Sequence, residues 1–314
     1  MNDFAKDVLK GLSSDPKFLP SKYFYDEAGS KLFEEIMHSE EYYLTDKEFE
    51  IMETHGADFL RHFQSREIPF DLIELGSGNG IKTQLLLEYF VSHQANFRYS
   101  PIDISGSALE KLTADVHAKF PSVQIHPIVG DYFHALEQVK ESKEFRKVLL
   151  FMGGNIGNFS EAETHTFLKK IHSYMNPNDL LVIGIDLWKN PLTIEAAYND
   201  STGYTREFNL NLLKRINREL GANFNVGSFM HYPTYDIEKS EMKSYLVSKK
   251  DQIVHIEELS TSFSFGAWEY IHTEISKKYS VSQIEKLATA TGFQVEEHVF
   301  DGEKYFTNSI WKKP

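Results

Sequence analysis

Cysteine is missing from all 314 residues of the sequence. Its absence excludes disulfides, thiolate nucleophiles and cysteine-ligated metals together, and it fits a chain made in a reducing compartment. The thirteen histidines are scattered, with no HExxH pattern and no visible ligand cluster. Isolated histidines are far more often packed or solvated than metal-bound, so we expect no metal site.

Long apolar runs and a basic excess are missing too. No run approaches the roughly 20 apolar residues that a membrane helix needs. The first residues lack the basic-then-apolar pattern of an export signal. The net charge is −13, whereas proteins that bind nucleic acid usually carry a basic excess or stripe. We therefore expect a cytoplasmic protein that engages neither membrane nor nucleic acid; the sequence sets no oligomeric state.

Short apolar runs alternate with helical patterns between residues 70 and 186. Strands are predicted at 70–75, 99–103, 123–129, 147–152 and 180–186, and helical spacing separates them. This alternation predicts an α/β fold with a parallel sheet. Residues 293–313 predict two strands joined by a tight turn, an antiparallel hairpin that would complete a Rossmann-like core.

Capping boxes and a change of pattern suggest where the elements and domains begin. Ser160 with Glu163, Ser280 with Gln283, and Thr45 with Glu48 each have the spacing of a capping box. After Asp186 the alternation stops, and a helical stretch precedes about fifty residues of strand character. We predict a core formed by residues 57–190 and 280–314. A second α+β domain, which would bind the substrate, would be formed by 1–56 and 191–279.

The strongest local motif is Glu74-Leu-Gly-Ser-Gly-Asn-Gly80, between a predicted strand and a predicted helix. Glycines there let the backbone approach a ligand closely. A dinucleotide fingerprint would need glycine at position 81, which is Ile81. The spacing instead resembles the S-adenosylmethionine loop. We expect cofactor contacts from Gly76, Ser77, Gly78 and Gly80.

Polar residues also follow the next two predicted strands. Asp103 comes at a strand end, where a carboxylate can accept the ribose hydroxyls, and Asp131 with Tyr132 follows the third strand, where adenine would lie. Lys82 is a candidate for the methionine carboxylate of the cofactor. Taken alone, either acid is as easily explained as a loop cap. Together, at successive strand ends, they favour a nucleotide-type ligand.

Longer segments carry a family resemblance. LPSKYFYDEAGSKLFEEIMHSEEYYLTDKE (19–48), the glycine loop, GGNIGNF (153–159), IDLWKNPLTIEAAYND (185–200), FNLNLLKRINRELGANF (208–224) and HTEISKKY (272–279) occur in this order. They resemble the histidine-specific N-α-methyltransferases, which make the trimethylated betaine of histidine, hercynine, for ergothioneine biosynthesis. The resemblance covers most of the chain. It implies methyl transfer from S-adenosylmethionine to the α-amino group of L-histidine, with S-adenosylhomocysteine as the other product.

The resemblance also implies a set of substrate-binding residues. It places Tyr25 and Tyr42 at the active site, with Phe33 as an apolar wall. It assigns the amino and carboxylate ends of the amino acid to Asn158 and Tyr198. For the imidazole it implies the carboxylate of Glu274, the hydroxyl of Ser276 and packing by Met242. A carboxylate that accepts the ring N–H beside a hydroxyl would favour histidine over phenylalanine or leucine.

Three alternatives remain open. The substrate could be another amino acid or small amine, since relatives of this family act on other aromatic amines. An NAD-linked oxidoreductase is disfavoured by Ile81. A non-catalytic S-adenosylmethionine-binding protein would bind the cofactor without turnover. No residue is identified as the catalytic base, because a tyrosine, water or bulk solvent could take the proton.

Overall fold

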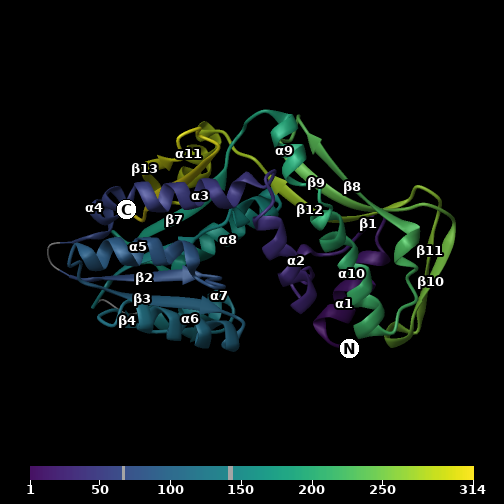
Figure 1. Cartoon of the computed structure of the whole chain (residues 1–314), viewed down its shortest axis with the longest axis horizontal. Helices are drawn as coiled ribbons and strands as arrows, with labels where there is room; N and C mark the ends of the chain where they lie inside the picture. The colour runs from purple at the N-terminus through teal and green to yellow at the C-terminus, as the bar shows by residue number, and fades with distance from the viewer. Residues whose placement is uncertain (66–67, 141–143) are drawn as a thin grey trace. The chain divides into compact units, whose positions relative to one another are not determined.

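The computed structural model describes residues 1–65, 68–140 and 144–314. The chain divides into two compact units, each assembled from segments that are distant in sequence. Residues 44–188 and 279–314 form the first, which we call the core unit; residues 1–43 and 189–278 form the other, which we call the second unit. The colours of Figure 1 follow this division: blue, teal and yellow segments build the core unit, and purple and green segments build the second.

The core unit contains an eight-stranded sheet with the order β13-β14-β7-β6-β2-β3-β4, in which β5 also pairs with β3. All pairings are parallel except those of β14 with its two neighbours, so the terminal hairpin is antiparallel as predicted. The strands are β2 (Phe70–Leu75), β3 (Phe97–Asp103), β4 (Gln124–Ile125), β5 (Ile128–Val129), β6 (Arg146–Phe151), β7 (Leu180–Asp186), β13 (Gln294–Phe300) and β14 (Phe306–Lys312).

Helices cover both faces of this sheet, because the central strands β2 and β7 are buried along their whole length (Figure 1). In β2, Ile73 and Leu75 pack with the helices of one face, whereas Phe70 and Leu72 pack with those of the other. The first face carries α7 (Tyr132–Val139), α8 (Glu161–Tyr174) and α11 (Val281–Ala290); the second carries α3 (Tyr43–Thr54), α4 (Gly56–Phe63), α5 (Ile81–Ser92) and α6 (Gly106–Lys119). This is the predicted Rossmann-like α/β architecture.

Two of the three predicted capping boxes are confirmed, at Ser160 with Glu163 and at Ser280 with Gln283. The third is wrong. The helix begins at Tyr43, ahead of Thr45, and the Glu48 carboxylate is buried in the core unit. The strand predicted at 123–129 is also interrupted: it forms β4 and β5, with Pro127 between them, because proline has no N–H for the ladder.

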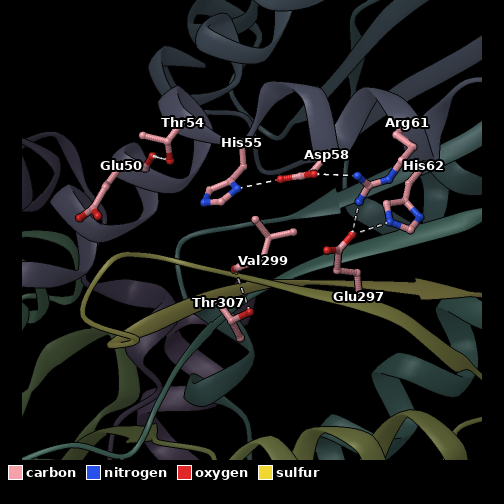
Figure 2. Close-up of polar contacts among 9 residues, drawn as sticks. All are labelled: Glu50, Thr54, His55, Asp58, Arg61, His62, Glu297, Val299 and Thr307. Carbon is pink, nitrogen blue, oxygen red and sulfur yellow. Dashed lines mark hydrogen bonds and ion pairs between the residues drawn. The ribbon is translucent and has the colours of Figure 1, made fainter.

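A chain of ion pairs and hydrogen bonds joins α4 to β13 within the core unit (Figure 2). Asp58 accepts from His55 Nδ1 at 2.8 Å and pairs with Arg61 at 2.9 Å. Glu297 then pairs with both Arg61 and His62, at 2.7 Å each. The Arg61 side chain is 59% exposed, so water and salt screen these charges. The network is therefore a surface tie between a helix and the terminal hairpin.

The second unit has a four-stranded sheet with the order β1-β12-β9-β8 and a separate hairpin of β10 and β11. Its apolar core gathers residues from the N-terminal helices, α10 and both sheets. Its elements are α1 (Asp3–Leu12), β1 (Lys17–Phe18), α2 (Glu27–Met37), α9 (Pro191–Ala197), α10 (Tyr204–Leu220), β8 (Phe229–Asp236), β9 (Glu241–Ser248), β10 (Gln252–Ile256), β11 (Thr261–Phe265) and β12 (Tyr270–Lys277).

The unit boundaries differ from the predicted domains mainly near the N-terminus. Residues 44–56 group with the core unit rather than with residues 1–43, because Ile51 and Met52 are buried against one face of the large sheet. Among the described residues, no helix is both long and apolar enough to span a membrane. The same residues contain no group of three or more histidines or acids arranged to hold a metal ion.

Candidate functional site

The glycine loop lies between β2 and α5, next to the point where the strand order reverses. In an open α/β sheet this is where ligands bind. Gly76, Gly78 and Gly80 all have positive φ, at +75°, +51° and +61°. A Cβ on Gly76 would lie 2.7 Å from the Tyr132 hydroxyl, and one on Gly80 would lie 2.5 Å from Leu112. The backbone and its packing therefore require glycine at these two positions.

Gly78 borders open space and Ser77 has a hydroxyl without a partner among the described residues, and a bound ligand would supply both missing contacts. A Cβ on Gly78 would meet no atom within 4 Å, so the space beside this glycine is open. The Ser77 hydroxyl is buried and has no hydrogen-bond partner among the described residues. A buried hydroxyl without a partner is costly unless a ligand or water satisfies it. The loop thus fits a polar cofactor that lies close to its backbone.

Asp103 and Asp131 are engaged differently. Asp103 accepts from the Gly78 N–H at 3.0 Å and from the Ser105 N–H at 2.9 Å, so it connects the end of β3 to the glycine loop. Asp131 caps α7 through the N–H groups of Phe133 and His134, and these bonds, led by that of His134, lower the pKa of its carboxyl. Both side chains thus follow their strands as predicted, and Asp131 has the loop-cap role that the sequence also allowed.

Glu74 is the buried acid that opens the glycine motif. Its carboxylate accepts from Thr83 Oγ1 at 2.7 Å and from the Tyr99 hydroxyl, which joins β2 to the first turn of α5 and to β3. Burial raises the pKa of Glu74 to about 7, and the hydrogen bonds from Tyr99 and Thr83 oppose the rise. Glu74 therefore holds together the three elements that shape the loop.

Lys82 bonds to a carboxylate of the protein itself. Its Nζ lies 2.6 Å from Glu48 Oε2, and Glu48 is fully buried. Glu48 also accepts from the Gly153 N–H at 2.9 Å and from the Asn308 amide at 3.0 Å. The structure therefore gives Lys82 an ion pair that the sequence did not suggest. Its contact with the cofactor carboxylate remains a prediction.

In the second unit, strand register brings together the predicted ring-binding residues. Met242 on β9 lies opposite Ser276 on β12, and Ser244 lies opposite Glu274. A β-bulge between His272 and Glu274 shifts the alternation of β12 ahead of this pair. Bulges re-aim side chains and are frequent beside functional sites. Met242, Ser276 and Glu274 are therefore neighbours on one small sheet.

Tyr198 joins this group from the end of α9. Its hydroxyl donates to Ser276 Oγ at 2.7 Å, within a buried environment. The ammonium of Lys278 lies 2.9 Å from the Tyr198 hydroxyl and 2.8 Å from Ser276 Oγ. Lys278 is fully buried. The sequence analysis missed it, because one lysine of the pair Lys277-Lys278 gives no sign of burial.

An aromatic cluster extends from Tyr198. The ring centre of Tyr42 lies 6.5 Å from that of Tyr198 and 6.1 Å from that of Phe33. The ring centres of Tyr25 and Phe33 are 5.4 Å apart, and all three pairs meet edge to face. Phe208 of α10, which the sequence analysis also missed, contacts both Tyr25 and Phe33. The helical spacing of Phe208 indicates only a buried face. The N-terminal tyrosines and Phe33 are thus brought to Tyr198 as one cluster.

Glu274 has a perturbed carboxyl. Desolvation raises its pKa to about 7, although the positive charge of Lys278 lowers it. Perturbed carboxyls are frequent at functional sites, because burial and charge there serve recognition or proton transfer. Asn158, the remaining predicted substrate residue, belongs to the core unit, where it ends a short 3₁₀ turn after the β6 strand.

Comparison with known proteins agrees with these features. A family model described as histidine-specific methyltransferase, SAM-dependent, matches residues 4–313. The chain is 33% identical over 274 residues to the histidine N-alpha-methyltransferase of Mycolicibacterium smegmatis, covering 87% of this chain and 84% of that protein. It is 34% identical over 244 residues to ergothioneine biosynthesis protein 1 of Neurospora crassa, covering 76% of this chain and 27% of that protein.

A more distant relative and a solved structure complete the comparison. The L-tryptophan methyltransferase trpM of Psilocybe serbica is 27% identical over 297 residues, with 87% of this chain and 82% of that protein covered. The structure of mitomycin 7-O-methyltransferase MmcR superposes with a TM-score of 0.50 and 12% identity, covering 93% of this chain and 59% of that chain, which supports the methyltransferase fold alone. The chain belongs to the family of histidine-specific, S-adenosylmethionine-dependent methyltransferases.

Proposed function

We propose that this protein transfers methyl groups from S-adenosylmethionine to the α-amino group of L-histidine, up to the trimethyl betaine hercynine. The observation that carries the proposal is the group formed by Tyr198, Met242, Glu274 and Ser276 in a chain whose family match spans residues 4–313. We infer a small-molecule enzyme of the cytoplasm that needs no nucleic acid and no membrane.

The proposed roles follow from the chemistry of each group. An imidazole presents an N–H and a lone-pair nitrogen, and Glu274 with Ser276 offers an acceptor and a hydroxyl to them. Met242, directly across from Ser276, would pack against the ring. Tyr198 and Asn158 would hold the amino and carboxylate ends. On the core unit, Gly76, Ser77, Gly78 and Gly80 would receive the cofactor, with Asp103 at its ribose, Asp131 and Tyr132 at its adenine and Lys82 at its carboxylate.

The mechanism that we propose is an in-line displacement. S-adenosylmethionine supplies a methyl group already activated on a sulfonium, so the protein has mainly to align and desolvate the reactants. The neutral amine would attack the methyl carbon as the C–S bond breaks, and S-adenosylhomocysteine would be the leaving group. The methylated amine then loses a proton before the next attack. No described side chain is assigned as the base, and solvent can take this proton.

The aromatic cluster fits a product that gains a permanent charge. Three transfers leave a trimethylammonium group, and aromatic faces stabilise such cations by about 0.5–2 kcal/mol. Tyr42, which contacts both Phe33 and Tyr198, and Tyr25, which is 47% exposed, are the candidates. Their rings would favour the trimethylated product, whose positive charge is permanent.

A second candidate is methylation of another aromatic amino acid. A relative named as a tryptophan methyltransferase shares 27% identity with this chain, which keeps this alternative in view. The polar pair of Glu274 and Ser276 favours histidine, because a site built to bond a polar ring penalises rings that leave its groups unpaired.

The proposal is tested by incubating the purified protein with S-adenosylmethionine and an equimolar pool of the free amino acids, followed by mass spectrometry. We expect histidine to gain one to three methyl groups while the other amino acids stay unmodified. Methylation of tryptophan or another amine instead would overturn the substrate and retain the cofactor. Cofactor binding without any product would support the non-catalytic alternative.

A further inference from the structure

We propose that Lys278 is a positioning residue that, together with the Tyr198 hydroxyl, occupies both lone pairs of Ser276 Oγ, so that the Ser276 hydroxyl donates its proton to the lone-pair nitrogen of the substrate ring. The inference rests on the proposed function, since it takes Ser276 to contact the imidazole. It goes beyond that function by stating which partner supplies the proton in this contact, and which two donors to Ser276 set this direction.

The first step is the geometry around Lys278. Its ammonium is fully buried, lies 2.8 Å from Ser276 Oγ and 2.9 Å from the Tyr198 hydroxyl, and stands 4.7 Å from the centre of the Tyr198 ring. An ammonium has three N–H donors and no acceptor. Both hydroxyl oxygens therefore accept from Lys278.

The second step counts the lone pairs of Ser276. A hydroxyl oxygen has two acceptor lone pairs and one O–H. One lone pair accepts from Lys278, and the other accepts from the Tyr198 hydroxyl at 2.7 Å. With both lone pairs used, the O–H is the only hydrogen-bonding capacity that Ser276 has left. A ring nitrogen that meets Ser276 must therefore be an acceptor.

The third step follows for the opposite edge of the ring. A neutral imidazole has one N–H and one lone-pair nitrogen. If the lone-pair nitrogen accepts from Ser276, the N–H must find its acceptor elsewhere, and the carboxylate of Glu274, two residues along β12, is the acceptor present in this group. Lys278 and Tyr198 thus select one tautomer of neutral histidine, through a hydroxyl that could otherwise act in either direction.

The experiment measures binding of ring analogues to the enzyme complexed with S-adenosylhomocysteine, by calorimetry. The 4-yl and 5-yl isomers of thiazolylalanine keep one lone-pair nitrogen and lack the ring N–H, whereas thienylalanine has neither. All share the amino acid end, so that contribution cancels in a ratio of Kd values. The quantity is the Kd of thienylalanine divided by that of the tighter thiazolylalanine.

In the wild type we expect this ratio to be roughly three to ten, the size of one neutral hydrogen bond. In Lys278→Met the ratio falls towards one, as it does in Ser276→Ala, because the freed lone pair lets the Ser276 hydroxyl accept as well as donate. Lys277→Met is the matched control: Lys277 neighbours Lys278 but points to the other face of β12, so its ratio stays at the wild-type value.

Two results overturn the proposal. One is a wild-type ratio near one, and the other is a Lys278→Met enzyme that binds both analogues more weakly in equal measure, which is the mark of a purely structural role. If Lys278→Met does not fold, Tyr198→Phe tests the same count, since it removes the other donor to Ser276 and should also lower the ratio. Failure of the wild type to methylate histidine would instead overturn the proposed function.

Discussion

Two opposing effects act on the carboxyl of Glu274. Desolvation raises its pKa to about 7, and the nearby charge of Lys278 lowers it. A desolvated carboxylate lowers the stability of the fold unless a ligand forms a hydrogen bond to it. An imidazole N–H would supply that bond, which is why we place the ring there.

Replacing Glu274 with alanine should therefore weaken histidine binding and leave cofactor binding unchanged. A hydrogen bond to a charged group contributes about 1.5–3 kcal/mol, so we expect the Kd of histidine to rise roughly tenfold to a hundredfold. Calorimetry with histidine and, separately, with S-adenosylhomocysteine measures both. Glu238→Ala, on an exposed turn of the same unit, is the control. An unchanged histidine Kd would remove Glu274 from the site.

Lys82 and Glu48 give a second prediction at this scale. Lys82→Met should destabilise the protein by about 3 kcal/mol, because it leaves the buried Glu48 carboxylate without its cation. Urea denaturation in the absence of cofactor measures this loss, and Lys111→Met on the exposed face of α6 is the control. If stability were unchanged while the Kd of S-adenosylmethionine rose, the ammonium would serve the cofactor and the ion pair would contribute little.

At the scale of elements, Glu74 joins β2, α5 and β3, and its titration links their packing to pH. Its pKa is about 7 in the folded protein and near 4.5 in the unfolded chain. Between these pH values the folded state binds a proton that the unfolded state does not. The free energy of unfolding therefore falls as the pH rises from about 4.5 to 7, by about 3 kcal/mol for this group.

Glu74→Gln should flatten this dependence, because an amide does not titrate and can still accept from Tyr99. We expect a shallower slope of unfolding free energy against pH between 5 and 7, and a variant that gains most relative to the wild type at pH 8. Chemical denaturation at a series of pH values measures it. Glu88→Gln, exposed on α5, should keep the wild-type slope. The same slope in both variants would contradict the assignment to Glu74.

The order of the elements could be predicted from the sequence, whereas some of their functional contacts could not. Apolar runs such as 70–75 and 180–186 specify buried strands locally, and Ser160 or Ser280 marks a helix start within four residues. Glu48 has the same local spacing from Thr45, but its partners Gly153 and Asn308 lie 105 and 260 residues away. Long-range pairing overrode the local pattern there.

Across the whole molecule, part of the candidate site could be predicted from local sequence and part could not. The glycine loop can be recognised in the sequence, because Gly76 and Gly80 have conformations and close neighbours that only glycine allows. The ring-binding group was predicted only through the family resemblance, since Tyr198, Met242 and Ser276 come from three segments that meet by folding. Lys278 was missed, because burial of a lysine depends on that meeting.

A final prediction concerns the whole chain: amide hydrogen exchange should show which unit each ligand contacts. S-adenosylhomocysteine alone should slow amide exchange in peptides that contain the glycine loop, residues 74–82, and the start of α7, because these backbone groups would contact it. Histidine should slow exchange in residues 24–43 and 197–204, which carry Tyr25, Phe33, Tyr42 and Tyr198. Histidine that protected only the segment 74–82 would mean that the second unit does not hold the amino acid, and the aromatic cluster would then be only part of its core.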